Sequence, residues 1–192
     1  MTRKLYQWMI DAAAKKNALW FLAIISFIES SFFPIPPDIM LIPMVVSTPR
    51  KAWKIAAVAT AASVIGGYFG YVIGFYGYDL IARPLLEFYG YLDKFENFKH
   101  YYTEYGAWIV FAAGITPFPY KVITIASGAV GLNLAVFGMA SVAARGLRFF
   151  IVAGLLYFFG EPIKKIIEKH FNLLSIIFFI LLLGGFVLIK YL

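Results

Sequence analysis

The stretch Phe27–Thr48, FIESSFFPIPPDIMLIPMVVST, decides how the rest of the chain is interpreted. It is apolar on both sides of a Pro-Ile-Pro-Pro break, and it carries two carboxylates, Glu29 and Asp38. Ionisable residues are costly at membrane depth, where they usually serve a function. The stretch therefore predicts a broken membrane segment with a functional site.

A second stretch, FAAGITPFPYKVITIASGAVG at residues 111–131, repeats this design with a cation. The corresponding residues, at one constant offset along the chain, are Pro34 and Pro117, Pro36 and Pro119, and Asp38 and Lys121. Proline cannot continue a helix, so these prolines and Pro37 are expected at the tips of two helical hairpins.

The composition is that of an integral membrane protein. Of 192 residues, 62% are hydrophobic and 14% are charged, and the mean hydropathy is +0.81. Soluble domains are nearer 45–50% apolar and about 25% charged. The net charge of +7 is attributed to short loops that set the topology, so no nucleic-acid partner is expected. The chain has no cysteine and hence no disulfide.

Charge distinguishes a kinked span from a hairpin in residues 18–48. As one helix the segment would be about 46 Å long, against a hydrocarbon core of about 30 Å. Basic residues flank it at both ends, namely Lys15, Lys16, Arg50, Lys51 and Lys54. Because cytoplasmic loops are enriched in Lys and Arg, both ends are expected to be cytoplasmic, with the turn near the midplane.

The sequence thus predicts an all-α polytopic protein with two facing re-entrant hairpins in an inverted repeat and about three full transmembrane helices. The expected order is an interfacial amphipathic helix (1–17), a membrane domain (18–160), and a basic segment with a C-terminal transmembrane helix (161–192). The membrane domain divides into hairpin 18–48, span 55–78, outer loop 79–105, hairpin 106–131 and span 133–160. The N-terminus is expected in the cytoplasm and the C-terminus outside.

Three glycines at every fourth position of the first span, Gly66, Gly70 and Gly74, predict a ridge of close helix packing. The buried acids have two interpretations. Glu29 and Asp38 could carry protons, because desolvation disfavours the charged carboxylate while a nearby cation favours it. Alternatively, Asp38 with Lys121 and Glu29 with an arginine form structural ion pairs that lock the hairpins.

Three cations, Lys121, Arg145 and Arg148, are expected in the same core as the two acids. Their excess suggests an anionic substrate group, and arginine suits phosphate because its guanidinium binds bidentately. Arg145 and Arg148 share roughly one helix face. In the alternative interpretation, Arg148 extends towards an interface and only Arg145 is buried.

Enzyme and metal sites find little support in the sequence. It lacks a Gly-x-Ser-x-Gly motif and a His-x-x-x-His or cysteine set, and its two histidines, His100 and His170, fall in segments expected on opposite sides. Neither a catalytic residue, a metal nor a cofactor is therefore expected.

At residues 29–38, ESSFFPIPPD, the chain resembles the DedA family, the bacterial branch of the VTT (SNARE-associated) superfamily, and most closely its YqaA-like members. The segments ASVIGGYFGY at 62–71 and TPFPYKVITIASG at 116–128 add to the resemblance, which covers roughly residues 20–160. The common family pattern R-x-x-P-x-x-R is absent from the second hairpin, where Gly114 and Tyr120 stand in the arginine positions and Lys121 is the cation.

The resemblance implies facing re-entrant hairpins and a role in moving lipid across a bacterial cytoplasmic membrane with dependence on the proton gradient. Glu29 and Asp38 match the family's membrane acids, and Arg145 resembles its essential arginine. The resulting hypothesis is a proton-coupled flippase of a polyprenyl phosphate or phospholipid. The alternatives are a non-catalytic membrane assembly or lipid-scrambling factor and a small-ion transporter. A homodimer is left open.

Overall fold

The computed structural model describes residues 17–32, 35–116, 118–160 and 162, and these residues form helices and connections without any strand. The helices are α2 (Ala18–Ser31), α3 (Asp38–Ser47), a 3₁₀ helix (Pro49–Lys51), α4 (Ala52–Gly77), a π-helix (Tyr78–Ala82), α5 (Arg83–Phe88), α6 (Leu92–Ile115), α7 (Tyr120–Ala129) and the helix Leu134–Gly160. The expected all-α class is confirmed for this part of the chain. Apart from Asn17 and Pro162, the expected interfacial helix and the expected C-terminal segment lie outside it.

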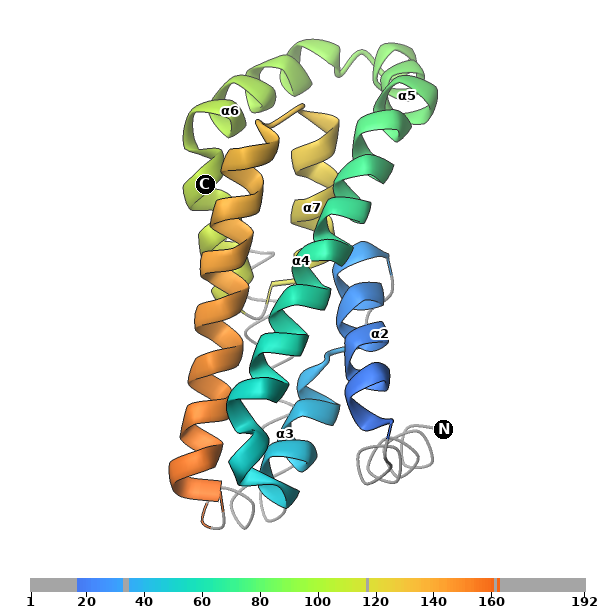
Figure 1. Cartoon of the computed structure of the whole chain (residues 1–192). Helices are drawn as coiled ribbons and strands as arrows, with labels where there is room; N and C mark the ends of the chain where they lie inside the picture. The colour runs from blue at the N-terminus through green and yellow to red at the C-terminus, as the bar shows by residue number, and fades with distance from the viewer. Residues whose placement is uncertain (1–16, 33–34, 117, 161, 163–192) are drawn as a thin grey trace.

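Within the described residues, two helical segments are long and apolar enough to cross a membrane: Pro49–Phe88, of 40 residues, and Leu134–Gly160, of 27 residues. They stand side by side for much of their length (Figure 1). Both correspond to predicted spans. A hydrocarbon core of about 30 Å needs about 20 helical residues, so either segment is long enough to span with a tilt.

Helices α2 and α3 form the first hairpin. Helix α2 ends at Ser31, and α3 begins at Asp38 after Pro37, whose φ of −65° suits a helix start. The start of α2, the end of α3 and the start of α4 all lie toward the same end of the molecule (Figure 1). The chain therefore turns back at the proline break. Pro36 and Pro37 lie in this break, and Pro34 falls outside the described residues.

Helices α6 and α7 form a second hairpin that approaches from the opposite end (Figure 1). Helix α6 ends with Thr116 in an extended conformation, and α7 starts at Tyr120 directly after Pro119. Pro117 falls outside the described residues. After α7, Gly131 takes a left-handed φ of +70°, which glycine adopts at little cost.

Helix α4 is the element against which both hairpins pack, and its glycines allow the close approach. A Cβ on Gly66 would collide with the Phe27 carbonyl of α2, and one on Gly74 would collide with the Ile125 carbonyl of α7. Gly70, between them, faces the Thr124 side chain. The ridge that was predicted from the spacing of four is thus a contact surface for both hairpins.

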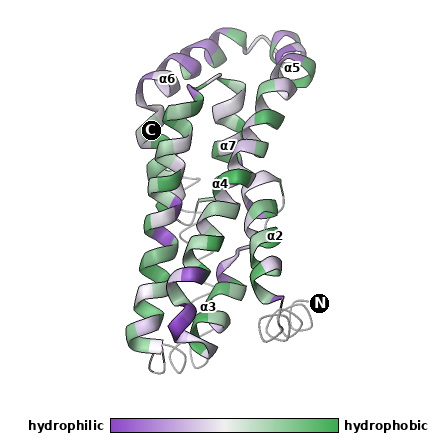
Figure 2. Cartoon of the chain, viewed as in Figure 1, coloured by the Kyte–Doolittle hydropathy of each residue, from purple (hydrophilic) through white to green (hydrophobic). Residues whose placement is uncertain are grey.

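The expected outer loop of residues 79–105 is largely helical. Helix α4 runs through the π-helix into α5, and α6 begins at Leu92 and crosses the expected hairpin boundary at residue 106 without interruption. Hydrophilic residues are concentrated on α5 and the first half of α6, whereas the remaining helices are mostly hydrophobic (Figure 2). Stacked rings of Tyr78 and Phe95, 4.8 Å apart, connect the π-helix to α6.

Candidate functional site

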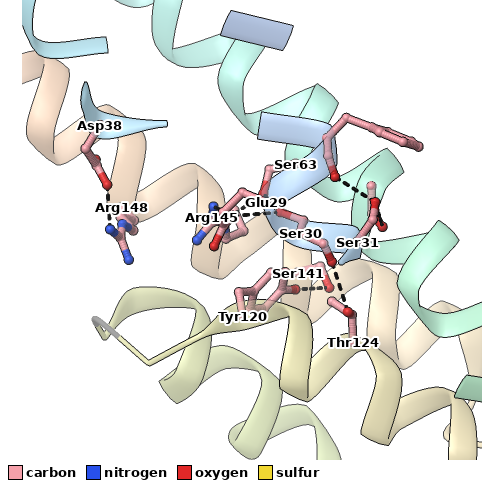
Figure 3. A network of polar contacts seen from close by, with 12 residues as sticks. Glu29, Ser30, Ser31, Asp38, Ser63, Tyr120, Thr124, Ser141, Arg145 and Arg148 are labelled. Atoms are coloured by element: carbon pink, nitrogen blue, oxygen red, sulfur yellow. Dashed lines mark hydrogen bonds and ion pairs between the residues drawn. The ribbon is translucent and has the colours of Figure 1, made fainter. Parts of the chain in front are cut away.

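A polar layer separates two apolar clusters in the described part of the molecule. One cluster holds α4 residues up to Ala59 and Leu134–Gly160 residues from Phe149 onward. The other holds Tyr71 of α4 and Phe137 of the last described helix. The polar residues lie between the two clusters. On the two long helices they are Ser63, Ser141 and Arg145, and on the hairpins they are Glu29, Ser30 and Thr124 (Figure 3).

Arg145 is the centre of this layer and is only 1% exposed. Its Nη2 donates to Glu29 Oε2 at 2.8 Å, and its Nε donates to Ser63 Oγ at 2.7 Å. A buried charge is tolerated when it is paired and hydrogen-bonded. The Glu29 side chain, 14% exposed, supplies the opposite charge. The guanidinium therefore joins the first hairpin to both α4 and its own helix.

Two serines complete the Glu29 environment. Ser30 Oγ donates to Glu29 Oε2 at 3.1 Å and lies 2.6 Å from Ser63 Oγ. Glu29 Oε2 thus accepts from both a guanidinium and a hydroxyl. The backbone of Ser30 also takes part, because its carbonyl accepts a hydrogen bond from Thr124 Oγ1 of α7 at 3.0 Å.

Arg148 forms a second, more accessible ion pair. Its Nη2 lies 2.7 Å from Asp38 Oδ2, with side chains that are 20% and 21% exposed. Its Nη1 donates to the Thr116 carbonyl at 3.0 Å. Asp38 begins α3 and Thr116 follows α6, so one guanidinium connects the broken ends of both hairpins.

These contacts correct one of the interpretations drawn from sequence. The expected pairing of Asp38 with Lys121 is wrong, because Asp38 binds Arg148 instead. The pairing of Glu29 with an arginine is present, with Arg145 as the partner. Arg148 is more exposed than Arg145, as the interfacial alternative expected, but it is held by an acid. Sequence alone could not choose among cations that lie on different elements.

Lys121 has a partly buried side chain in the first turn of α7. Its carbonyl accepts a hydrogen bond from Thr124 Oγ1 at 2.9 Å. Among the described residues, its ammonium makes no salt bridge with an acid. The structure therefore brings four of the five predicted charged residues together as two ion pairs and leaves Lys121 as a cation without a described carboxylate partner.

Aromatic rings also contact the buried guanidinium. Arg145 Cζ lies 4.9 Å from the Tyr120 ring centre and 4.7 Å from that of Phe149. Tyr120 is itself fully buried and donates its hydroxyl hydrogen to Ser141 Oγ at 2.6 Å. Cations within about 6 Å of a ring centre are attracted to the ring face. The polar layer thus contains an aromatic part supplied by the second hairpin.

Sequence reasoning missed the hydroxyl groups of the site, carried by Ser30, Ser63, Tyr120 and Ser141. Serine and tyrosine occur widely in apolar helices, and no spacing rule marks those that face a charge. One signal was present, because Ser30 follows Glu29 in the same acidic motif. The described residues contain no group of His, Cys, Asp and Glu side chains that could hold a metal ion.

Comparisons with known proteins give the same family as the motifs. A family model for the VTT domain matches residues 35–158, a range that contains Asp38, Lys121, Arg145 and Arg148 but begins after Glu29. An uncharacterized protein of Haemophilus influenzae is 36% identical over 171 residues, which are 89% of this chain and 88% of that protein. A homologue from Histophilus somni is 35% identical over 157 residues, or 82% of each chain. No solved structure matches the chain.

Proposed function

This chain belongs to the VTT domain (DedA) family of membrane proteins, and from that premise we propose that it moves an anionic lipid phosphate across the cytoplasmic membrane together with protons. The proposed substrate is a phospholipid or a polyprenyl phosphate. The observation that carries the proposal is the pairing of Glu29 and Asp38, each partly buried, with an arginine of the Leu134–Gly160 helix. These pairs lie where the two hairpin breaks approach each other (Figure 3).

The proposed coupling is a competition for the guanidinium of Arg148. While Asp38 is ionised, it occupies Arg148 Nη2. A proton on Asp38 removes the charge that holds the arginine, and the freed guanidinium can then bind a phosphate with two parallel hydrogen bonds. Loss of the phosphate and of the proton on the other side of the membrane restores the ion pair. Proton binding and anion binding are thereby linked.

The two ion pairs differ in exposure, and we assign them different parts. Asp38 and Arg148 are each about one-fifth exposed, so a head group can reach them without opening the core. Arg145 is buried, and its pair with Glu29 changes only when the hairpins separate. Lys121 adds a point charge without a described acid partner and would attract the phosphate to the layer.

The proposal includes the membrane topology. In this topology both hairpins re-enter the bilayer from opposite faces, which requires protein or a water-filled cavity beside their non-helical breaks. The basic residues around the start of α4, Arg50, Lys51 and Lys54, place that end in the cytoplasm under the positive-inside tendency. Helix α5 and the first half of α6, where hydrophilic residues are concentrated (Figure 2), would then lie outside.

Lipid translocation in proteoliposomes tests the proposal. The assay offers a labelled phospholipid and a short polyprenyl phosphate in parallel, with and without an imposed pH gradient. We expect wild-type protein to move one label faster with the gradient. We expect Asp38→Asn to lose the response to the gradient, because an amide takes no proton and carries no charge.

Arg83→Gln is the matched control, since Arg83 also forms an ion pair, 3.1 Å from Glu87, but on an exposed surface away from the polar layer. It should keep the wild-type rate and gradient response. If Asp38→Asn responds to the gradient as the wild type does, the coupling mechanism is wrong. If no label moves in any vesicle, the transport proposal itself is wrong.

A second candidate function, a lipid-scrambling or assembly factor, is favoured by one observation. Both arginines hydrogen-bond partners on other elements, namely the two hairpins and α4, as they would if they only locked the fold. This candidate predicts gradient-independent lipid movement, or none. It also predicts that substitutions of the acids change lipid movement only as far as they lower protein stability.

A further inference from the structure

Tyr120 is the site residue that the coupling mechanism leaves without a part. It is the first residue of α7, its side chain is fully buried, and its ring centre lies 4.9 Å from Arg145 Cζ. Its hydroxyl donates to Ser141 Oγ at 2.6 Å. A tyrosine buried for packing alone needs only a hydrogen-bond partner, whereas this one also presents its ring to a buried cation.

Tyr120 contacts two successive turns of one helix. Ser141 and Arg145 are four residues apart and so share a helix face. The hydroxyl of Tyr120 reaches the first and its ring reaches the second (Figure 3). Glu29 approaches the same guanidinium from the first hairpin. Arg145 is therefore held between the first hairpin, through an ion pair, and the second hairpin, through a ring.

The second ring at the guanidinium cannot make this connection. Phe149 lies on the same helix as Arg145, four residues further on, and its ring moves with the arginine. Tyr120 belongs to a different element and fixes Arg145 relative to the second hairpin. When Glu29 loses its charge, the ion pair is lost, and among the described residues Ser63 and Tyr120 still contact Arg145 from other elements.

We propose that Tyr120 is a positioning residue, which keeps the Arg145 guanidinium in the polar layer while Glu29 carries a proton. The inference rests on the proposed proton-coupled transport and extends it, because that mechanism protonates Asp38 and the inference adds a protonated state of Glu29. Its physical basis is separate, because attraction between a desolvated cation and a ring does not require a carboxylate. The ring thus preserves the geometry of the site in the state in which the ion pair is absent.

The first test measures transport in three variants. Tyr120→Leu removes the ring and should raise the KM for the lipid about tenfold. This factor corresponds to the free energy of a desolvated cation–π interaction. It should also displace the pH profile of transport. Tyr120→Phe keeps the ring and should retain a KM close to the wild type.

Tyr71→Leu is the matched control. Tyr71 is also a buried tyrosine with one hydroxyl bond, to the Leu132 carbonyl at 2.6 Å, and its ring does not contact Arg145. It should lower thermal stability about as much as Tyr120→Leu but leave KM and the pH profile unchanged. Equal effects of the two leucine variants on KM and on the pH profile would overturn the proposal.

The second test does not depend on transport. A double-mutant cycle combines Tyr120→Leu with Arg145→Gln and reads the unfolding equilibrium in detergent. Glutamine removes the positive charge and with it the attraction to the ring. We expect the effects of the two substitutions on the unfolding equilibrium constant to depart from additivity by about tenfold, and we expect Tyr71→Leu with Arg145→Gln to be additive.

Repeating the cycle in Glu29→Gln protein mimics the protonated acid and keeps the test independent of lipid. The coupling between Tyr120 and Arg145 should persist there at least undiminished. Additivity in either background would overturn the inference, even if lipid transport is established. Coupling between Tyr120 and Arg145 in both backgrounds would support the inference, whether or not wild-type vesicles move lipid. Absence of lipid movement would refute only the proposed transport.

Discussion

Arg145 and Arg148 lie three residues apart on one helix but meet different surroundings. Arg145 is almost completely buried, with a carboxylate, a hydroxyl and two rings as partners. Arg148 is partly exposed and bridges a carboxylate and a carbonyl. Breaking a buried ion pair costs far more than breaking an exposed one, because the remaining charge is left without compensation. The two arginines should therefore respond differently to loss of their acids.

Removal of the Glu29 carboxylate tests this difference. We expect Glu29→Ala to destabilise the protein by about 3–5 kcal/mol, because Arg145 would be left buried without its counter-charge. Glu29→Gln should cost less, since its amide oxygen can still accept from Arg145 and Ser30. Thermal unfolding in detergent measures both. Asp38→Ala is the comparison, with a smaller expected loss, and an equal loss at both positions would contradict the account.

At the scale of elements, α4 is the surface against which both hairpins are placed. Gly66 admits the backbone of α2, and Gly74 admits the backbone of α7. Close contact between helix backbones in membranes depends on such small residues. This close approach also explains the hydroxyl contact near Gly70, because Thr124 of α7 can reach the Ser30 carbonyl of α2 only where these helices lie close together.

Gly74→Ala should disturb the second hairpin. Its Cβ would collide with the Ile125 carbonyl, and overpacking of this kind typically costs about 1–3 kcal/mol. Gly77→Ala is the matched control on the same helix, since nothing lies within 4 Å of its added Cβ. It should be neutral or stabilising by up to about 1 kcal/mol, because alanine is the better helix former. Equal melting temperatures for the two variants would show that α4 and α7 do not pack as described.

The sequence predicted the elements better than their ends. Pro36, Pro37 and Pro119 lie at the breaks, because proline removes a backbone donor and disfavours a continuing helix, although Pro43 lies inside α3. The helical continuation from α4 into α5 was not predicted, because Asp79 and Arg83 in the sequence suggested a loop. Tertiary contacts such as the stacked rings of Tyr78 and Phe95 support that helix, and local charge gives no indication of them.

At the scale of the molecule, two hairpins from opposite ends meet at one polar layer between two apolar clusters. The charged residues of this layer could be predicted, because ionisable side chains in apolar segments are rare and need partners. The sequence could not predict that Asp38 pairs with Arg148 or that Tyr120 contacts Arg145. Both depend on how separate elements are placed in space, which no local pattern records.

The proposed topology gives a prediction at this scale. The chain lacks cysteine, so single cysteines report position without background. A cysteine at Arg50 should react with an impermeant thiol reagent only from the cytoplasmic side, and one at Lys94 only from the outer side. Labelling of inverted and right-side-out vesicles measures this. Reaction of the Arg50 cysteine from outside would contradict re-entry of the first hairpin.

The most direct measurement of the central claim records lipid movement and internal pH in the same proteoliposomes. The account predicts that movement of the lipid phosphate down its gradient changes the internal pH, and that Asp38→Asn abolishes this change. The change arises because each exchange of the Asp38–Arg148 pair moves a proton with the anion. Lipid movement in wild-type vesicles without any change in internal pH would contradict proton coupling and favour a passive scramblase.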